Sequence, residues 1–278
     1  MTVKKIRDLL PADLISGIGD ACVAIPDWAF VPDEWSTAFL RGLLALAPSW
    51  EGKRIWEVGV GTGINLLVLH PRVRGAPVWY FSDFDERCVP LAVENLSRRN
   101  REQLFPLHGK WDLLTPNGGE SPDADIIFAC IPQVPMEMGL EVGDALAHYY
   151  CPERYPNSHL HPCGLGLVEA LLQQARGVLS RRGEVVLNLG GRPGLRRLRS
   201  MFADNGYRPR VVHEEVIPQH AGTSLKALAA LEGNGHEDFE FFVEPDGTSP
   251  ICAYTAEARR VTDLPVYHKI YVIAGTMM

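Results

Sequence analysis

The sequence lacks a long apolar run, a closely spaced cysteine pair and an excess of basic residues. No stretch approaches the roughly 20 apolar residues that a membrane-spanning helix needs. The first residues, Met1–Arg7, also lack the apolar core of a signal peptide. These absences argue against a membrane partner and predict a cytoplasmic protein.

Features that bind metals or nucleic acids are equally scarce. The six cysteines include no C-x-x-C pair, which favours reduced thiols over disulfides or structural zinc. His159, His161 and Cys163 are close in sequence, but histidines are common in loops and we expect no metal site. The net charge of −7 argues against a nucleic-acid partner, which prefers a basic surface. Oligomeric state is not encoded in any pattern that we recognise.

The chain does have enough apolar residues for one large core, since 46% of its 278 residues are hydrophobic. Strand patterns alternate with helical ones, which predicts a single α/β domain with a mainly parallel sheet. Helices are expected near residues 86–99, 165–179 and 195–205, and later strands near 104–108, 125–130, 184–189, 210–217 and 266–273. We divide residues 1–278 into an N-terminal cap (1–50), a cofactor-binding half (51–133), a lid insertion (134–163) and a substrate-side half (164–278).

The most informative motif is the run Arg54–Gly63, a buried strand that leads through a glycine turn into a helix. Its glycines, Gly59, Gly61 and Gly63, follow Glu57 with the spacing G-x-G-x-G, whereas the dinucleotide fingerprint is G-x-G-x-x-G. Glycines allow positive φ and let a ligand lie against the backbone. We therefore predict S-adenosylmethionine rather than NAD, with Glu57 orienting the loop or meeting the cationic methionyl part.

A second acid supports that prediction. The apolar run Val78–Ser82 ends at Asp83, about two dozen residues after the glycines, where an acid at a strand end can bind both ribose hydroxyls. Asp83 is our predicted ribose anchor. The alternative is a helix cap, but Asp85 is better placed for that role.

Together these motifs resemble the Rossmann-like class I S-adenosylmethionine-dependent methyltransferases. The resemblance implies a seven-stranded, mostly parallel sheet whose last strand is antiparallel. It also implies that Asp112 and Leu113 flank the adenine, and that Phe84 and Cys130 contact the cofactor. S-adenosylhomocysteine would be the second product.

Two motifs after later strands are candidates for the acceptor site. Cys130-Ile131-Pro132-Gln133 stands where many amine methyltransferases carry Asn-Pro-Pro-Tyr, so an amine acceptor loses an orienting hydrogen bond. Gln133 is still placed to orient an acceptor, although an ordinary proline turn is the alternative. In Asn188–Gly194, Arg192 precedes a helix, where a cation opposes the helix dipole. The Arg192 guanidinium can bind a substrate carboxylate, and an internal salt bridge is an equally good interpretation. Asn188 could add a polar contact at the same strand end.

A narrower resemblance rests on several ordered motifs. They are Val31–Ser36, Cys130–Gln133, Gly164–Leu167, Asn188–Gly194, Phe239–Phe242 and Pro250–Ala253. In combination they resemble methionine S-methyltransferases, from about Ile25 to Ala256. The large aminotransferase-like region of the plant enzymes is absent, so the chain is similar to the short bacterial form associated with dimethylsulfoniopropionate synthesis. It departs from the plant pattern at Val60, at Thr62 and throughout 134–163.

This resemblance implies methyl transfer to the thioether of L-methionine, giving S-methyl-L-methionine. A thioether has no proton to lose, so no general base is expected, and positioning by Gln133 and Tyr150 takes its place. Aromatic faces can hold sulfonium groups by cation–π contact, and Trp35, Tyr149, Tyr150 and Tyr254 are the candidates. Two other functions remain open: methylation of a protein glutamine or small amine, and cofactor binding by a non-catalytic regulator.

Overall fold

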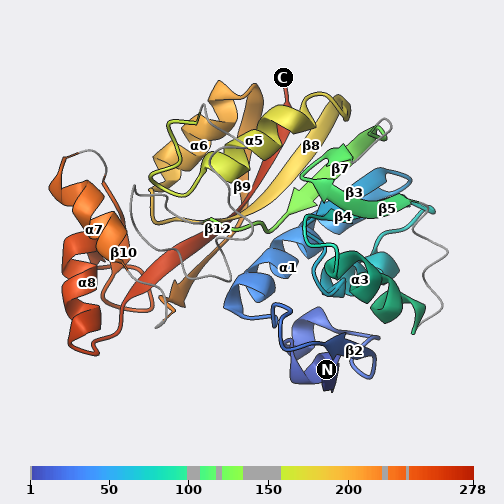
Figure 1. Ribbon diagram of the computed structural model, residues 1–278, viewed down its shortest axis with the longest axis horizontal. Coiled ribbons are helices and arrows are strands. Elements are labelled where there is room, and N and C mark those ends of the chain that lie inside the picture. Colours follow the sequence, from blue (N-terminus) through green and yellow to red (C-terminus); the bar gives the residue numbers. More distant parts are fainter. Residues whose placement is uncertain (1, 99–106, 117–120, 134–157, 221–224, 236–237) are drawn as a thin grey trace.

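A twisted central sheet with helices on both faces forms the protein (Figure 1). The computed structural model describes residues 2–98, 107–116, 121–133, 158–220, 225–235 and 238–278. The sheet has ten strands in the order β11-β10-β12-β8-β7-β3-β4-β5-β6, and β9 pairs with β12. These strands are β3 (Arg54–Val58), β4 (Val78–Asp83), β5 (Leu107–Asp112), β6 (Thr115–Pro116), β7 (Ala124–Ala129), β8 (Leu179–Gly190), β9 (Tyr207–Pro218), β10 (Phe241–Phe242), β11 (Pro250–Ile251) and β12 (Tyr267–Met277).

The predicted Rossmann-like fold is confirmed in its central part. Strands β5, β4, β3, β7 and β8 are parallel, whereas β12 is antiparallel to both β8 and β9, as expected for the last strand. The predicted count of seven strands is too low for the whole sheet, because three further strands, β6, β10 and β11, are added, each only two residues long.

Helices cover both faces of this sheet. The described helices are α1 (Glu34–Leu46), α2 (Ile64–Leu69), α3 (Cys88–Ser97), α5 (Gly166–Ala175), α6 (Leu195–Asp204), α7 (Lys226–Gly233) and α8 (Ala253–Val261). Successive strand residues point to opposite faces. Ile55 accordingly packs in one apolar cluster with α1, α2 and α3, while Trp56 packs in the other with α5 and α6. The carboxyl ends of the parallel strands meet at one edge between these layers.

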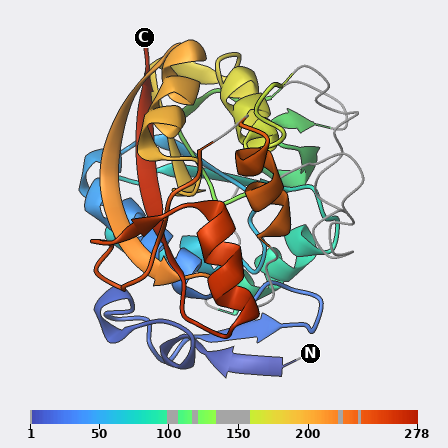
Figure 2. The same ribbon diagram turned by 90° about the vertical axis from the view of Figure 1, so that its left-hand side faces the viewer.

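The N-terminal residues form a small layer beside the main sheet. Strands β1 (Thr2–Lys5) and β2 (Cys22–Ile25) pair antiparallel at one end of the molecule (Figure 2). Helix α1 then begins with a capping box in which Ser36 N donates to Asp33 at 3.1 Å. It lies close to β12, because a Cβ on Gly42 would come within 2.6 Å of Val272. This packing places the first turn of α1 at the carboxyl edge of the sheet.

The long connection 218–265 has more structure than its sequence indicates. It contains α7 and α8, which lie beyond the start of β12 and far from β3 and β4 (Figure 1). Phe241 and Phe242 form β10 and are buried.

Candidate active site at the carboxyl edge

The glycine loop follows β3 and has the conformation that its sequence predicts. Gly59, Gly61 and Gly63 have φ values of 77°, 53° and 76°, a region that side chains rarely adopt. A Cβ on Gly63 would also lie 3.2 Å from the Cβ of Ala92, so a glycine there lets α2 start close to α3. The loop therefore exposes backbone rather than side chains toward the sheet edge.

Glu57 lies near the end of β3 and is buried. Its Oε1 accepts a hydrogen bond from Asn65 Nδ2 at 2.8 Å, while Oε2 has no partner among the described residues. Burial raises the pKa of Glu57 well above its usual value, and the nearby Asp83 carboxylate adds to the rise. A buried carboxylate oxygen without a partner is costly, and a cationic group of a ligand would satisfy it.

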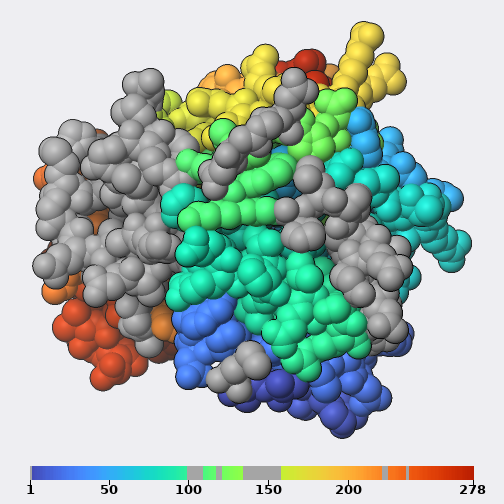
Figure 3. All heavy atoms as spheres, turned by 45° about the vertical axis from the view of Figure 1, so that its right-hand side comes forward, coloured from blue at the N-terminus to red at the C-terminus, as the bar shows by residue number. Residues whose placement is uncertain are grey.

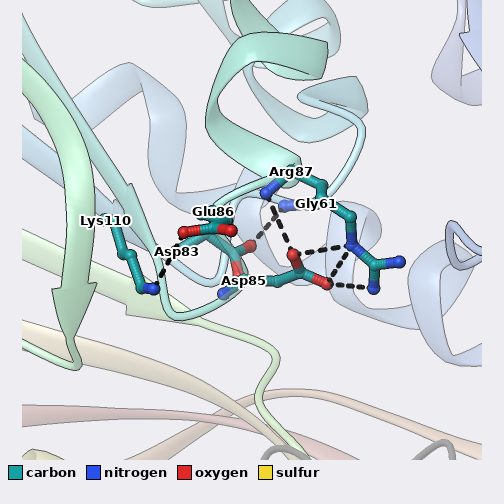
Figure 4. Close-up of polar contacts among 6 residues, drawn as sticks. All are labelled: Gly61, Asp83, Asp85, Glu86, Arg87 and Lys110. Atoms are coloured by element: carbon teal, nitrogen blue, oxygen red, sulfur yellow. Dashed lines mark hydrogen bonds and ion pairs between the residues drawn. The ribbon is translucent and has the colours of Figure 1, made fainter.

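Asp83 ends β4 and connects two loops of the predicted cofactor site (Figure 4). Its Oδ2 accepts from Gly61 N and its Oδ1 accepts from Asp85 N, both at 2.9 Å. Helix α3 starts only at Cys88, and its N-cap, Arg87, makes no side-chain cap. Asp83 is therefore not the N-cap of α3. Its carboxylate also accepts from the Cys88 thiol, which leaves it capacity for one more donor such as a ribose hydroxyl.

The predicted adenine-binding residues follow β5. Asp112 is the last residue of that strand, and Leu113 has a φ of 55° and a buried side chain. The carbonyl of Leu113 accepts from Ser82 Oγ at 3.3 Å, which brings this turn beside the end of β4. Phe84 is half-buried next to Asp83. With Cys130 after β7, the predicted cofactor residues thus lie at the carboxyl ends of four adjacent strands, β7, β3, β4 and β5, and their contacts with a cofactor remain predictions.

Asn188 organises the acceptor side of the same edge. Its Nδ2 donates to the carbonyl of Trp35 at 3.0 Å and to Cys130 Sγ at 3.4 Å, which joins α1, β7 and β8. Its Oδ1 is buried and has no partner among the described residues. Burial raises the pKa of Cys130 to about 11, so its thiol stays protonated at neutral pH.

Gln133 forms a two-bond pair with the backbone of Gly190. Its Oε1 accepts from Gly190 N at 2.8 Å, and its Nε2 donates to Gly190 O at 3.1 Å. A Cβ on Gly190 would meet the Trp35 ring at 2.7 Å and both Arg192 and Gln133 at 3.4 Å. Trp35, Gln133 and Arg192, three of the predicted substrate residues, therefore converge around one glycine.

Arg192 is the charged group of this cluster and only 7% exposed. Its guanidinium lies 5.9 Å from the centre of the Trp35 ring. Burial lowers the pKa of Arg192 to about 10, which still leaves it protonated at neutral pH. Among the described residues no acid forms an ion pair with it, so the salt-bridge alternative has no support in this part of the chain.

His268, which no sequence pattern indicated, completes the cluster. Its ring lies 5.6 Å from that of Trp35, and burial together with the charge of Arg192 lowers its pKa to about 3. Its Nδ1 lies 3.0 Å from the carbonyl of Lys269. A carbonyl can only accept, so Nδ1 carries the hydrogen and Nε2 presents a lone pair. A single histidine in a strand gave no signal of this role.

The remaining predicted substrate residues are not placed in the cluster. Tyr149, Tyr150 and most of the lid insertion lie outside the described residues. Tyr254 is 72% exposed on α8, at the opposite end of the molecule from β3 and β4 (Figure 1). Its described contact is a backbone hydrogen bond to Glu232.

Other candidate sites were sought in the described ranges. A cavity of about 930 Å³ lies along α6 and is lined by residues including Met201, Glu232 and Phe239, but none of the predicted cofactor or substrate residues lines it. No described helix has the length and apolar character needed to cross a membrane. No group of three potential metal ligands occurs in the part of the chain that the structure describes.

Comparison with known proteins identifies related sequences. No family model matches the chain. The methionine S-methyltransferase of Zea mays is 28% identical over 270 residues, which cover 87% of this chain and 24% of that protein. The Arabidopsis thaliana enzyme is 28% identical over 254 residues, covering 82% and 24%. The predicted resemblance is confirmed. The chain spans about a quarter of the length of these methionine S-methyltransferases.

Two of the solved structures with a similar course of the chain are described as methyltransferases. One from Pyrococcus furiosus has a TM-score of 0.49 and 14% identity, covering 96% of each chain. A putative RNA methyltransferase from Pyrococcus horikoshii has a TM-score of 0.47 and 13% identity, covering 92% of this chain and 91% of that one.

Proposed function

We propose that the protein transfers a methyl group from S-adenosylmethionine to the thioether sulfur of L-methionine, giving S-methyl-L-methionine and S-adenosylhomocysteine. The observation that carries the proposal is the buried Arg192 guanidinium, which has no acid partner among the described residues and lies beside Trp35, whose carbonyl accepts from Asn188. This cluster adjoins the glycine loop, since a Cβ on Gly59 would lie 3.3 Å from Ile131, directly after Cys130. An amino-acid carboxylate is the ligand that such a guanidinium fits.

The residues present also fit the cofactor. Glu57 offers a methionyl ammonium a buried oxygen that has no partner among the described residues, and Asp83 can still accept from a ribose hydroxyl. When bound, S-adenosylmethionine supplies an electrophilic methyl group on a sulfonium. Gly59 and Gly61 carry no side chains. The loop can therefore adopt positive φ, and a ligand can lie against its backbone.

The acceptor residues position the substrate and move no proton. Arg192 binds the carboxylate, and Asn188 Oδ1 accepts from the ammonium of the amino acid. The Trp35 face lies beside the reacting sulfur and stabilises its positive charge, a contact worth about 0.5–2 kcal/mol. Alignment of the two reactants lowers the activation barrier by more, roughly 7–11 kcal/mol when both are held in reacting geometry. Neither Cys130 nor His268 has a pKa suited to a general base near neutral pH.

The same edge gives less support to an amine acceptor. Gln133 replaces the side chains that orient an amine in many such enzymes, and its amide is paired with the backbone of Gly190. A regulator without activity would not require a buried guanidinium next to the cofactor loop. We further propose, from the resemblance to the short bacterial form, that S-methyl-L-methionine feeds dimethylsulfoniopropionate synthesis in the cytoplasm.

One assay tests the function. The purified protein is given methyl-labelled S-adenosylmethionine with each amino acid separately, and products are identified by mass. We expect label in S-methyl-L-methionine and in no amino-acid amine. Label on glutamine or on another amine would contradict the proposal, and cofactor binding without transfer to any acceptor would favour a regulator.

A further inference from the structure

Residues 26–33, here called the strap, connect the N-terminal layer to α1 and carry an unusual set of exposed apolar side chains. Trp28 is 40% exposed, Phe30 65% and Val31 46%. Pro26 and Pro32 restrict the backbone near both ends of the strap. Three large apolar residues within four positions are more than a solvated connection needs, so their surroundings indicate what they contact.

The chain entering the strap is fixed to the glycine loop. Ala24, in β2, donates its N–H to Asn95 Oδ1 at 2.7 Å and accepts from Asn95 Nδ2 at 3.1 Å. The same Nδ2 donates to the carbonyl of Thr62 at 3.0 Å. Asn95 is fully buried in α3, so its single amide ties β2 directly to the cofactor loop.

The first half of the strap is fixed to the loop after Asp83. The guanidinium of Arg87 lies 4.4 Å from the centre of the Trp28 ring, a close cation–π contact. Asp85 holds Arg87 in place by accepting from its Nε at 2.9 Å and from a terminal nitrogen at 2.6 Å. Figure 4 shows Arg87 extending from Asp85 on the side away from Lys110. The N-terminal residues lie against α3 on the surface seen in Figure 3.

The other end of the strap reaches the acceptor side. Asp33 caps α1, and its charge contributes to the raised pKa of Cys130 at the end of β7. Two residues later, the carbonyl of Trp35 is held by Asn188 of β8. The strap therefore connects the loop after β4 with the end of β8, two strands that β3 and β7 separate in the sheet. That span is roughly 14 Å at the usual strand spacing, which seven extended residues reach easily.

We propose that the strap covers the bound S-adenosylmethionine, that Phe30 packs on its ribose and methionyl part, and that Arg87 is a positioning residue that holds Trp28 in the same cover. The proposal rests on the proposed cofactor. The strands between β4 and β8 are those whose ends carry Glu57, Gly59 and Cys130. The exposed Phe30 side chain would accordingly be covered by the ligand in the complex.

The test compares S-adenosylhomocysteine binding and the stability of the free protein. Phe30→Ala should leave the melting temperature of the free protein within about 1 °C, since the side chain is 65% exposed. The dissociation constant of Phe30→Ala for S-adenosylhomocysteine, measured by calorimetry, should rise roughly tenfold because one aromatic contact with the ligand is lost. Leu264→Ala, another exposed apolar residue, is the matched control and should change neither quantity.

Arg87 is tested through Trp28. Arg87→Gln should weaken binding about fivefold in the wild-type background and have no effect when Trp28 is already alanine. Arg98→Gln, which removes an exposed arginine of the same helix region paired with Glu94, is its control. Hydrogen exchange at residues 26–33 should slow when S-adenosylhomocysteine is added.

Three outcomes separate the possibilities. Equal affinities of wild type and Phe30→Ala, within twofold, would overturn the cover while leaving the proposed cofactor intact. Equal effects of Arg87→Gln with and without Trp28 would remove Arg87 from the positioning role. A wild-type protein that binds neither S-adenosylmethionine nor its product would overturn the proposed function together with the cover.

Discussion

Asp83 accepts a hydrogen bond from the backbone N–H of Gly61 at 2.9 Å, so the acid at the end of β4 and the glycine turn after β3 form one unit. Its second oxygen holds Asp85 N at the same distance. Burial raises the pKa of Asp83, while these two backbone hydrogen bonds lower it. The carboxylate thus orders both loops before any ligand is present, and a ribose would meet an acceptor that is already oriented.

Replacing Asp83 should abolish cofactor binding while leaving the fold intact. Asp83→Ala removes two loop hydrogen bonds and a charge-assisted contact with the ribose worth roughly 1.5–3 kcal/mol. We expect no measurable S-adenosylmethionine binding by calorimetry and an unchanged circular dichroism spectrum, with a modest fall in melting temperature. Asp123→Ala, an exposed acid at the amino end of β7, is the control. An unchanged dissociation constant in folded Asp83→Ala would remove this residue from the cofactor site.

Glu57→Gln should stabilise the free protein and weaken the cofactor complex. Burial raises the folded-state pKa of Glu57, so this residue's contribution to stability is complete below its unfolded pKa and is lost as pH rises through the folded value. Glu57→Gln has no carboxyl group to ionise, so it does not lose this stability as pH rises. Its melting temperature should match wild type near pH 5 and exceed it by about 2–4 °C at pH 8. Glu51→Gln, at an exposed position, should show no such difference.

The binding half of this prediction has its own measurement. The dissociation constant for S-adenosylhomocysteine should rise about tenfold in Glu57→Gln at pH 8, because the buried Oε2 no longer offers a charge to the ligand's ammonium. A variant that binds as tightly as wild type would show that Glu57 only orients the loop through Asn65.

Arg192→Gln should affect methionine far more than the cofactor. The lost charge-assisted hydrogen bonds predict a KM for methionine roughly 10- to 100-fold higher, with the affinity for S-adenosylhomocysteine changed less than twofold. Methionine methyl ester should be a poor substrate of the wild-type protein for the same reason. Arg199→Gln, on the exposed side of α6, is the control. If the ester and methionine react equally well, the guanidinium does not bind the carboxylate.

The sequence predicted those parts of the site that depend on local chemistry. The positive φ of Gly59 and the acid at the end of β4 could both be predicted, because a glycine spacing and a strand-terminal acid are local sequence patterns. The antiparallel last strand followed from the family resemblance and is confirmed. Arg192 was found because a cation before a helix is electrostatically misplaced there.

Residues whose role depends on tertiary packing were missed. His268 enters the cluster only because α1 packs against β12 and brings Trp35 beside it. Arg87 and Trp28 are about 60 positions apart and meet because Asn95 anchors β2 to the glycine loop. The helices α7 and α8 were hidden in a connection with several prolines and glycines.

The last prediction concerns protons. The attacking sulfur of methionine carries no hydrogen, and three titratable groups of the acceptor cluster keep their charge state near neutral pH: the pKa of His268 is about 3, that of Arg192 about 10 and that of Cys130 about 11. Single-turnover rates with both substrates saturating should therefore be nearly flat from about pH 6.5 to 8.5, measured by rapid quench. Homocysteine is the internal comparison, because its thiol must ionise before attack and its rate should rise almost tenfold per pH unit below a pKa near 8.5. A similar rise with methionine, abolished by substituting one histidine or acid, would mean that proton transfer is required and that positioning alone does not account for the reaction.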